Sequence, residues 1–175
     1  MKDSWDISTF TGIKFKFDDP EFNIIDIAHA LSHQCRFVGH TNRFYSIAQH
    51  SLLVSELMSN DLKLTGLLHD ATEAYLGDVS RPLKRYLPDY KLIEENLQIK
   101  LCSWANIIYP FSKAIHDADY ILLVNEAQQL MADKGKDWYK KDIEVPYIEI
   151  KEYSMSEIKN MFIVEYYKLK EKLCV

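Results

Sequence analysis

The chain has 175 residues, 47% of them hydrophobic, which is the length and composition of one globular domain spanning residues 1–175. Its formal net charge of −5 argues against a broad basic face, and therefore against a nucleic-acid polymer as partner. No stretch approaches the ~20 apolar residues of a membrane span, and the first residues lack the apolar core of a signal peptide. Three scattered cysteines indicate reduced thiols, so we expect a cytoplasmic protein without a membrane partner.

The first third of the chain shows one strand pattern and two helix patterns. Residues 7–17 alternate apolar and polar side chains around a glycine turn, which predicts a short β-hairpin. Apolar residues at helical spacing predict helices over residues 24–33 and 44–58. The polar stretch between them, residues 34–43, predicts a loop with basic and aromatic side chains.

A third predicted helix begins at the N-cap Asp61 and closes at Gly77. The later elements are a helical turn within 80–88, helices over 89–105 and 112–132, an edge strand at 146–150, and a last helix opened by the capping box Ser154-x-x-Glu157. Six or seven helices with a small β extension favour an all-α bundle.

The helix that begins at Asp61 carries His69 and Asp70 side by side, with Glu73 one turn later. Residues three and four apart share a helix face, so these side chains converge. Unpaired carboxylates in apolar surroundings are costly, and a bound cation is the usual remedy. His50 and Asp119, each on another predicted helix, complete a set of two imidazoles and two carboxylates. Such a mixed set suits Mn, Fe, Co, Ni or Zn rather than Ca.

These residues follow the order found in the HD-domain phosphohydrolases, namely a His, then a His-Asp pair, then a distant Asp. The chain resembles this family in the stretches Phe44–Val54, Leu67–Val79 and Ile115–Leu123, and residues 26–40 are similar to its small phage and bacterial members. The resemblance implies an HD-domain helical bundle with an N-terminal β-hairpin. It also implies a location in the host cytoplasm if a phage encodes the chain.

The resemblance carries over the metal ligands His50, His69, Asp70 and Asp119. Asp117 is a rival for the last place, and we prefer Asp119 because Ala118-Asp119 followed by an apolar turn matches the family motif better. The cofactor would be one divalent transition ion, Zn, Co or Mn, with a further Mg or Mn ion accompanying a triphosphate.

Two further carboxylates are candidates for catalysis. A divalent ion lowers the pKa of bound water toward ~7, and Glu73 could position or deprotonate that water. Asp78 could hold a neighbouring basic side chain or the sugar of the substrate. The alternatives are an exposed helix residue for Glu73 and a turn residue at a helix end for Asp78.

A polyanionic substrate requires local cations in a protein of net negative charge. By resemblance, Arg36 and Phe37 match an Arg-aromatic pair beside the sugar and base, and Lys84 and His116 fall where phosphate contacts occur. Arg43 and His40 lie in the same predicted loop as Arg36 and are further candidates for binding the substrate.

Small stand-alone HD proteins include 5'-deoxynucleotidases and phage dATP triphosphohydrolases. We expect a dNTP triphosphohydrolase acting on dATP, releasing deoxynucleoside and triphosphate. The alternatives are a 5'-deoxynucleotidase acting on deoxynucleoside monophosphates and a nucleotide-binding sensor without turnover. The last helix is apolar on more than one side, so a homo-oligomer is expected. His29 and His33, four residues apart, could suggest a second metal site, but no carboxylate motif accompanies them.

Overall fold

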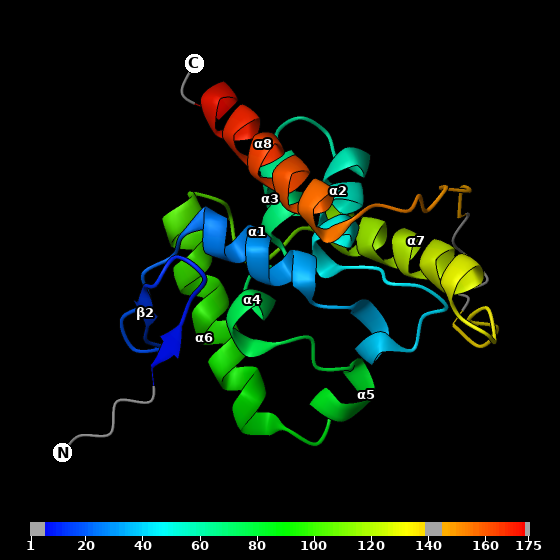
Figure 1. Cartoon of the computed structure of the whole chain (residues 1–175), viewed down its shortest axis with the longest axis horizontal. Coiled ribbons are helices and arrows are strands. Elements are labelled where there is room, and N and C mark those ends of the chain that lie inside the picture. The colour runs from blue at the N-terminus through cyan, green and yellow to red at the C-terminus, as the bar shows by residue number, and fades with distance from the viewer. Residues whose placement is uncertain (1–5, 139–144, 174–175) are drawn as a thin grey trace.

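The computed structural model describes residues 6–138 and 145–173. It is mostly helical, with one two-stranded antiparallel sheet (Figure 1). In chain order the elements are β1 (Ile7–Ser8), β2 (Lys14–Phe15), α1 (Ile24–His33), the 3-10 turn η1 (Arg36–Gly39), α2 (Ile47–Leu57), α3 (Lys63–Leu68), α4 (Glu73–Leu76), α5 (Arg81–Lys84), α6 (Pro88–Ala105), α7 (Lys113–Leu130) and α8 (Met155–Leu173).

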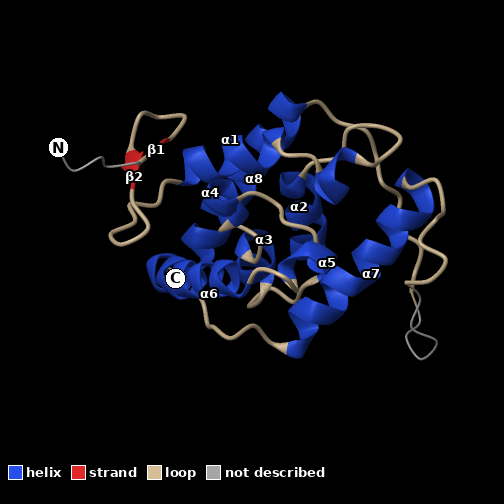
Figure 2. Ribbon diagram, turned by 90° about the horizontal axis from the view of Figure 1, so that it is seen from below, coloured by secondary structure: helices blue, strands red, loops and turns tan. Residues whose placement is uncertain are grey.

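The predicted hairpin is confirmed. Ile7 lies opposite Phe15 in the antiparallel pair, and Gly12 takes a positive φ of 92° in the turn. The Phe15 ring is buried and stacks on Tyr75 of α4 at a centroid distance of 3.8 Å. The hairpin is thereby attached to the helical body, at the end of the molecule opposite α7 (Figure 2).

The core forms where α8 packs across α1, α2 and α3, and where α1 contacts α4. Helix α8 starts at the predicted capping box, in which the Ser154 N–H donates to the Glu157 carboxylate at 2.8 Å. Its buried face meets the apolar faces of the other helices through side chains that include Ile27, Leu31, Ile47, Leu67, Leu101 and Phe162. No helix among the described residues is both long enough and apolar enough to cross a lipid bilayer.

The single helix predicted from Asp61 to Gly77 is wrong. The structure divides it into α3 and α4, and the residue at the start of α3 is Leu62, without a side-chain cap. Between the two helices the Ala71 and Glu73 N–H groups bond three residues back, to Leu68 and Asp70. The helix can stop here because the His69 side chain itself donates to the Gly66 carbonyl, at 2.8 Å.

The predicted edge strand at 146–150 is also wrong. This segment belongs to an extended strap, residues 145–153, whose backbone pairs with side-chain amides instead of another strand. Asn125 of α7 binds the Pro146 carbonyl and the Ile148 N–H, and Gln129, one turn later, binds the Ile148 carbonyl and the Ile150 N–H. An amide offers both a donor and an acceptor, so it can replace a strand partner.

The described cysteines, Cys35 and Cys102, are free thiols, in accord with the expectation. Cys174 lies outside the described residues.

Gly66 fixes the spacing between α2 and α3, because an added Cβ would lie 3.0 Å from the Ser55 Cα and 3.0 Å from the Met58 side chain. We therefore expect Gly66→Ala to destabilise the protein by about 1–3 kcal/mol through overpacking, measured by urea denaturation. Helix propensity alone predicts the opposite sign, a gain of up to ~1 kcal/mol. Ser103→Ala on the exposed side of α6 is the control, and a stabilised Gly66→Ala protein would contradict the tight contact.

Candidate metal centre

Three predicted ligands converge from three different helical segments. His50 comes from α2, His69 follows α3 directly, and Asp119 lies on α7. One ligand atom of each lies within 4.8 Å of the others, as a single metal ion requires. His50 is fully buried and His69 nearly so, whereas Asp119 is partly open to solvent. The ion would therefore sit at the boundary between core and surface.

Hydrogen bonds on the far side of each ring fix the tautomer. The Nδ1 atom of His50 lies 2.6 Å from the Glu126 carboxylate, and that of His69 lies 2.8 Å from the Gly66 carbonyl. Both acceptors require a proton on Nδ1, so in the neutral rings the two Nε2 atoms carry free lone pairs. Both Nε2 atoms are buried and lack a hydrogen-bond partner. Two orphaned imidazole nitrogens beside a carboxylate are what a transition metal ion would satisfy.

Asp70 lies beside the same two rings. Its carboxylate is 3.2 Å from His69 Nε2 and 3.7 Å from His50 Nε2. Burial opposes its ionisation, but His69, His50 and Arg36 hold the pKa of Asp70 well below its usual range. Asp70 therefore faces the ring nitrogens as an anion, but it is not part of the group of three whose ligand atoms lie within 4.8 Å of one another.

Asp119, and not its rival Asp117, reaches the histidines. The Asp119 carboxylate lies 3.3 Å from His50 Nε2, while Asp117 is turned to an exposed ion pair with Lys113 at 2.6 Å. Burial would raise the pKa of Asp119, but the neighbouring His50 lowers it to about 2. Residues two apart on a helix point in different directions, which separates the two aspartates.

Glu126 is a site residue that sequence reasoning missed. It is fully buried on α7 and accepts hydrogen bonds from His50 Nδ1 and from the Tyr45 hydroxyl, the latter at 2.9 Å. It also pairs with the Arg36 guanidinium at 3.1 Å. Glu126 lies seven residues, or two helical turns, after Asp119. That spacing in an apolar helix was the available signal.

Arg36 forms ion pairs with Glu126 and with Asp70, both of which contact a histidine of the candidate centre. Its side chain is only 12% exposed and lies between Glu126 and Asp70, at 3.1 and 3.6 Å. Burial disfavours its charge, but the surrounding carboxylates raise the pKa of Arg36 above its usual value. With Arg36 neutralising Glu126, Asp70 and Asp119 supply the two negative charges that a divalent cation balances.

The two carboxylates predicted to act in catalysis lie next to this centre. Glu73 is buried, one of its carboxylate oxygens lacks a partner, and burial together with Asp70 and Asp78 raises its pKa well above the usual value. Burial also raises the pKa of Asp78. Lys84 lies 4.0 Å from Glu73 and pairs more closely with Glu94 at 2.5 Å.

The remaining predicted contacts to the substrate lie in different surroundings. Phe37 takes a left-handed conformation in η1, and its ring lies 5.4 Å from the Arg36 guanidinium carbon. His40 and His116 are exposed. Arg43 binds the strap through the Ile150 carbonyl and through Glu152.

Sequence reasoning missed two further residues near the site. Trp138 stacks on Phe37 with ring centroids 5.9 Å apart and an interplanar angle of 19°. Arg81, at the start of α5, is 77% exposed and reaches to 3.9 Å from the Asp119 carboxylate. Trp138 follows the end of α7, and Arg81 begins the short helix α5. Neither residue belongs to a local sequence motif that would mark it as part of a site.

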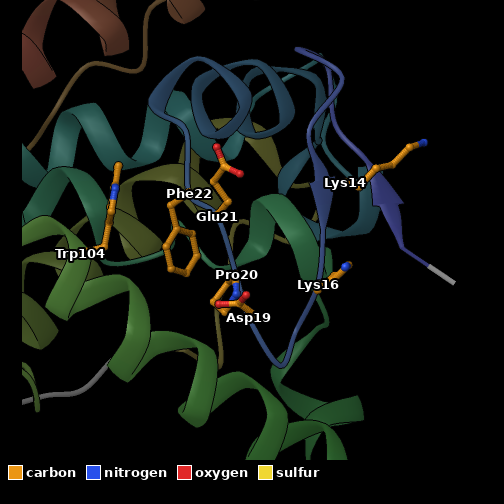
Figure 3. A pocket seen from close by; sticks show the side chains of 7 residues that line it. All are labelled: Lys14, Lys16, Asp19, Pro20, Glu21, Phe22 and Trp104. Atoms are coloured by element: carbon orange, nitrogen blue, oxygen red, sulfur yellow. The ribbon is translucent and has the colours of Figure 1, made fainter. Parts of the chain in front are cut away.

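A surface hollow of about 460 Å³ lies elsewhere on the molecule, between the hairpin, the segment 19–22 that leads into α1, and α6 (Figure 3). Trp104 and Phe22 form one side of it, and Lys14 and Lys16 extend outward on the other. None of the predicted site residues lines this hollow. The hollow is therefore separate from the histidines of the candidate metal centre.

Comparison with known proteins places the chain in a family. The chain is 42% identical to the protein YfdR of Escherichia coli over 135 residues, which cover 75% of this chain and 76% of YfdR. The chain belongs to the YfdR family. An uncharacterized protein of Rhodobacter capsulatus is 33% identical over 147 residues, or 74% of each chain. YfdR is likewise described as uncharacterized, so the likeness transfers no activity. No protein-family model matches the chain.

Glu126 accepts a hydrogen bond from the predicted ligand His50 in this YfdR-family protein. Glu126→Gln should therefore weaken Mn²⁺ or Zn²⁺ binding by about 10–100-fold, measured by isothermal titration calorimetry. The amide keeps the size of the side chain but removes the charge that faces His50 and Arg36. Glu56→Gln, on the exposed side of α2, is the matched control. Equal affinities of the two variants would show that Glu126 does not act on the metal.

The pKa of His50 gives a second test. Burial and Arg36 disfavour the charged imidazole, but Glu126 and Asp119 outweigh them and raise its pKa from 6.5 to about 9. In the metal-free protein this group stabilises the fold fully below pH 6.5, and the contribution is lost as the pH rises towards 9. A metal ion competes with the proton for Nε2. The increase in melting temperature produced by Mn²⁺ over EDTA should therefore grow between pH 6.5 and 9, and a constant increase would contradict the assignment of His50.

Proposed function

We propose that this protein is a metal-dependent phosphohydrolase of deoxynucleotides. The observation that carries the proposal is the pair of buried, unpartnered Nε2 atoms of His50 and His69, which face Asp70 and Asp119. Both rings are fixed by a hydrogen bond on Nδ1. The order of these residues along the chain is also that of the HD-domain phosphohydrolases, the resemblance on which the choice of substrate rests.

The donor set fits one divalent transition ion, with His50, His69, Asp70 and Asp119 as the residues that would hold it. When bound, such an ion acidifies water and polarises a phosphate oxygen. Glu73 then serves as the general base, because burial and the neighbouring carboxylates Asp70 and Asp78 raise its pKa and so make it a stronger base than an ordinary carboxylate. Lys84, 4.0 Å away, limits that rise by favouring the charged form.

The finer proposal is a dATP triphosphohydrolase, which releases deoxynucleoside and triphosphate. Arg81, close to Asp119, and the exposed His116 on the same helix offer positive or hydrogen-bonding groups beside the proposed metal position. The Phe37 ring, next to Arg36, offers a stacking surface for the sugar or base.

A second candidate is a 5'-deoxynucleotidase. Two of the cations expected to bind phosphate are already engaged, since Arg43 pairs with Glu152 and Lys84 pairs with Glu94. Fewer free cations suit a monophosphate better than a triphosphate, which carries more charge. The same metal centre and the same Glu73 would serve either reaction.

The exposed apolar side chains of α8 support the homo-oligomer expected from the sequence. Ile158 and Phe162 are buried within the chain, whereas Val164 is 65% exposed and Tyr167 is 50% exposed on the outer side. A second copy of the chain would cover them.

The paired aspartates of α7 give a sharp test of the metal mechanism. We expect Asp119→Asn to lower turnover of the preferred nucleotide on the order of 100-fold or more, through loss of a metal ligand. Asp117→Asn, two residues away and paired with Lys113, should retain turnover close to that of the unchanged protein. Both variants are assayed with dATP and dAMP in the presence of Co²⁺, Mn²⁺ or Zn²⁺.

The products decide between the candidates. Triphosphate released from dATP supports the leading proposal, and inorganic phosphate released only from dAMP supports the second. Nucleotide binding without hydrolysis under any of the three ions would identify a sensor and overturn both. Turnover unchanged by Asp119→Asn would show that the proposed ligands do not drive the reaction.

A further inference from the structure

Buried side-chain atoms without a hydrogen-bond partner gather in two places among the described residues. One is the metal centre, with His50 Nε2, His69 Nε2 and a carboxylate oxygen of Glu73. The other is a cavity between the hairpin, α1 and α4, where the unpartnered atoms are Thr9 Oγ1, His29 Nδ1 and the Tyr75 hydroxyl. Among the described residues, Ser51 Oγ is the only other buried side-chain atom without a hydrogen-bond partner. Unsatisfied buried groups are rare enough to require an explanation.

The second cavity is small and mixed in character. Its volume is about 130 Å³, compared with ~30 Å³ for one water molecule in the liquid. Apolar side chains such as Ile7, Ala30 and Ala74 form part of its lining. Burial of the Tyr75 hydroxyl raises its pKa, an effect only partly offset by the neighbouring Asn23 backbone. Tyr75 therefore enters the cavity as a neutral hydroxyl.

Asp26 gives this cavity a negative charge. Its side chain is only 3% exposed, and its two oxygens accept hydrogen bonds from the Thr11 N–H and hydroxyl, at 2.7 Å each. Both donors are neutral, and Asp26 forms no ion pair with the residues that the structure describes. A buried carboxylate without a cation is costly.

The His29 ring is held in place by stacking. The Phe10 ring stacks on the His29 ring at a centroid distance of 3.7 Å, and the His33 ring also stacks on it, at 4.1 Å. Burial, together with the neighbouring His33 and Lys159, lowers the pKa of His29, so the ring is neutral near pH 7. A neutral imidazole can accept a hydrogen bond at Nδ1.

We propose that the cavity binds a small ammonium ion, such as ammonium or methylammonium. Four groups at its wall can accept hydrogen bonds: Asp26, Thr9 Oγ1, Tyr75 Oη and His29 Nδ1. An ammonium ion carries up to four N–H donors and one positive charge. It can therefore donate a hydrogen bond to each unpartnered atom and also balance the negative charge of Asp26. This site is separate from the metal centre and does not rest on the proposed function.

Other occupants fit the same groups less well. An anion would face the Asp26 carboxylate. A divalent transition metal prefers thiolate, imidazole or carboxylate ligands, whereas two of the four groups here are neutral hydroxyls. Potassium is close to ammonium in size but gains nothing from the imidazole nitrogen, because it prefers oxygen ligands. Water would satisfy the hydrogen bonds but leave the charge of Asp26 unbalanced.

The test uses the full-length protein and ¹⁵N-labelled ammonium. We expect a saturable ammonium resonance whose protons exchange slowly with water, displaced by methylammonium but not by equal concentrations of potassium or tetramethylammonium. Thr9→Val and Tyr75→Phe should each weaken binding about tenfold, as loss of one hydrogen bond to a charged group predicts. Tyr166→Phe removes a hydroxyl that does not line the cavity and should leave binding unchanged.

The ligand series on the unchanged protein decides the question even where a variant fails to fold. Absence of a protected resonance would show that the cavity holds only water, and the proposal would be wrong. Displacement by potassium as strongly as by methylammonium would identify a general monovalent-cation site instead. Equal binding by Tyr75→Phe and the unchanged protein would place the ion elsewhere.

Discussion

The buried Glu126 carboxylate is the interaction on which the centre depends. The Glu126 carboxylate accepts hydrogen bonds from His50, Tyr45 and Arg36, and thereby connects α7 with η1, with α2 and with the segment between them. Burial of this carboxylate would be prohibitive alone, but Arg36 and His50 lower the pKa of Glu126 and keep it charged. The same three bonds that make the burial tolerable also turn His50 Nε2 toward His69 and Asp119. Stability and site geometry therefore come from one set of contacts.

The break between α3 and α4 has a comparable role on the other side of the centre. If the helix continued, His69 and Asp70 would point in directions about 100° apart. In the observed turn the His69 ring takes the Gly66 carbonyl, and the Asp70 carboxylate lies 3.2 Å from the free nitrogen of that ring. The turn therefore places the side chains of two neighbouring residues beside one another. Gly66 also permits the close contact between α2 and α3 on which their spacing depends.

The strap holds α7 in position from outside. Asn125 and Gln129 lie on α7 on either side of Glu126 and bind the strap backbone, while Gln49, next to His50, binds the Lys151 carbonyl at 2.8 Å. The helix that supplies Asp119 and Glu126 is thus tied to the helix that supplies His50. The strap then leads directly into α8, whose buried face packs into the core.

Much of this was accessible from the sequence. Periodicity determined α1 at its observed bounds, the hairpin, the capping box of α8 and the largely helical class, because these depend on local spacing and local hydrogen bonds. The order His50, His69, Asp70, Asp119 along the chain predicted which residues form the candidate site. The sequence did not reveal that residues 146–150 pair with side-chain amides, because those amides belong to α7. It also did not reveal that Asp61 fails to cap α3, since the Asp61 carboxylate interacts with the nearby Ser59 instead.

Only the tertiary structure decided the roles of the polar side chains. Arg36 and Arg43 are the same residue type in the same predicted loop. In the structure, Arg36 is buried between Glu126 and Asp70, whereas Arg43 binds the strap. Glu126 became visible as the residue that fixes His50 only when α2 and α7 met. A residue's chemistry is set by its own atoms, and the sequence supplies that; its charge state, tautomer and partners are set by burial and by neighbours from distant segments, which packing alone determines.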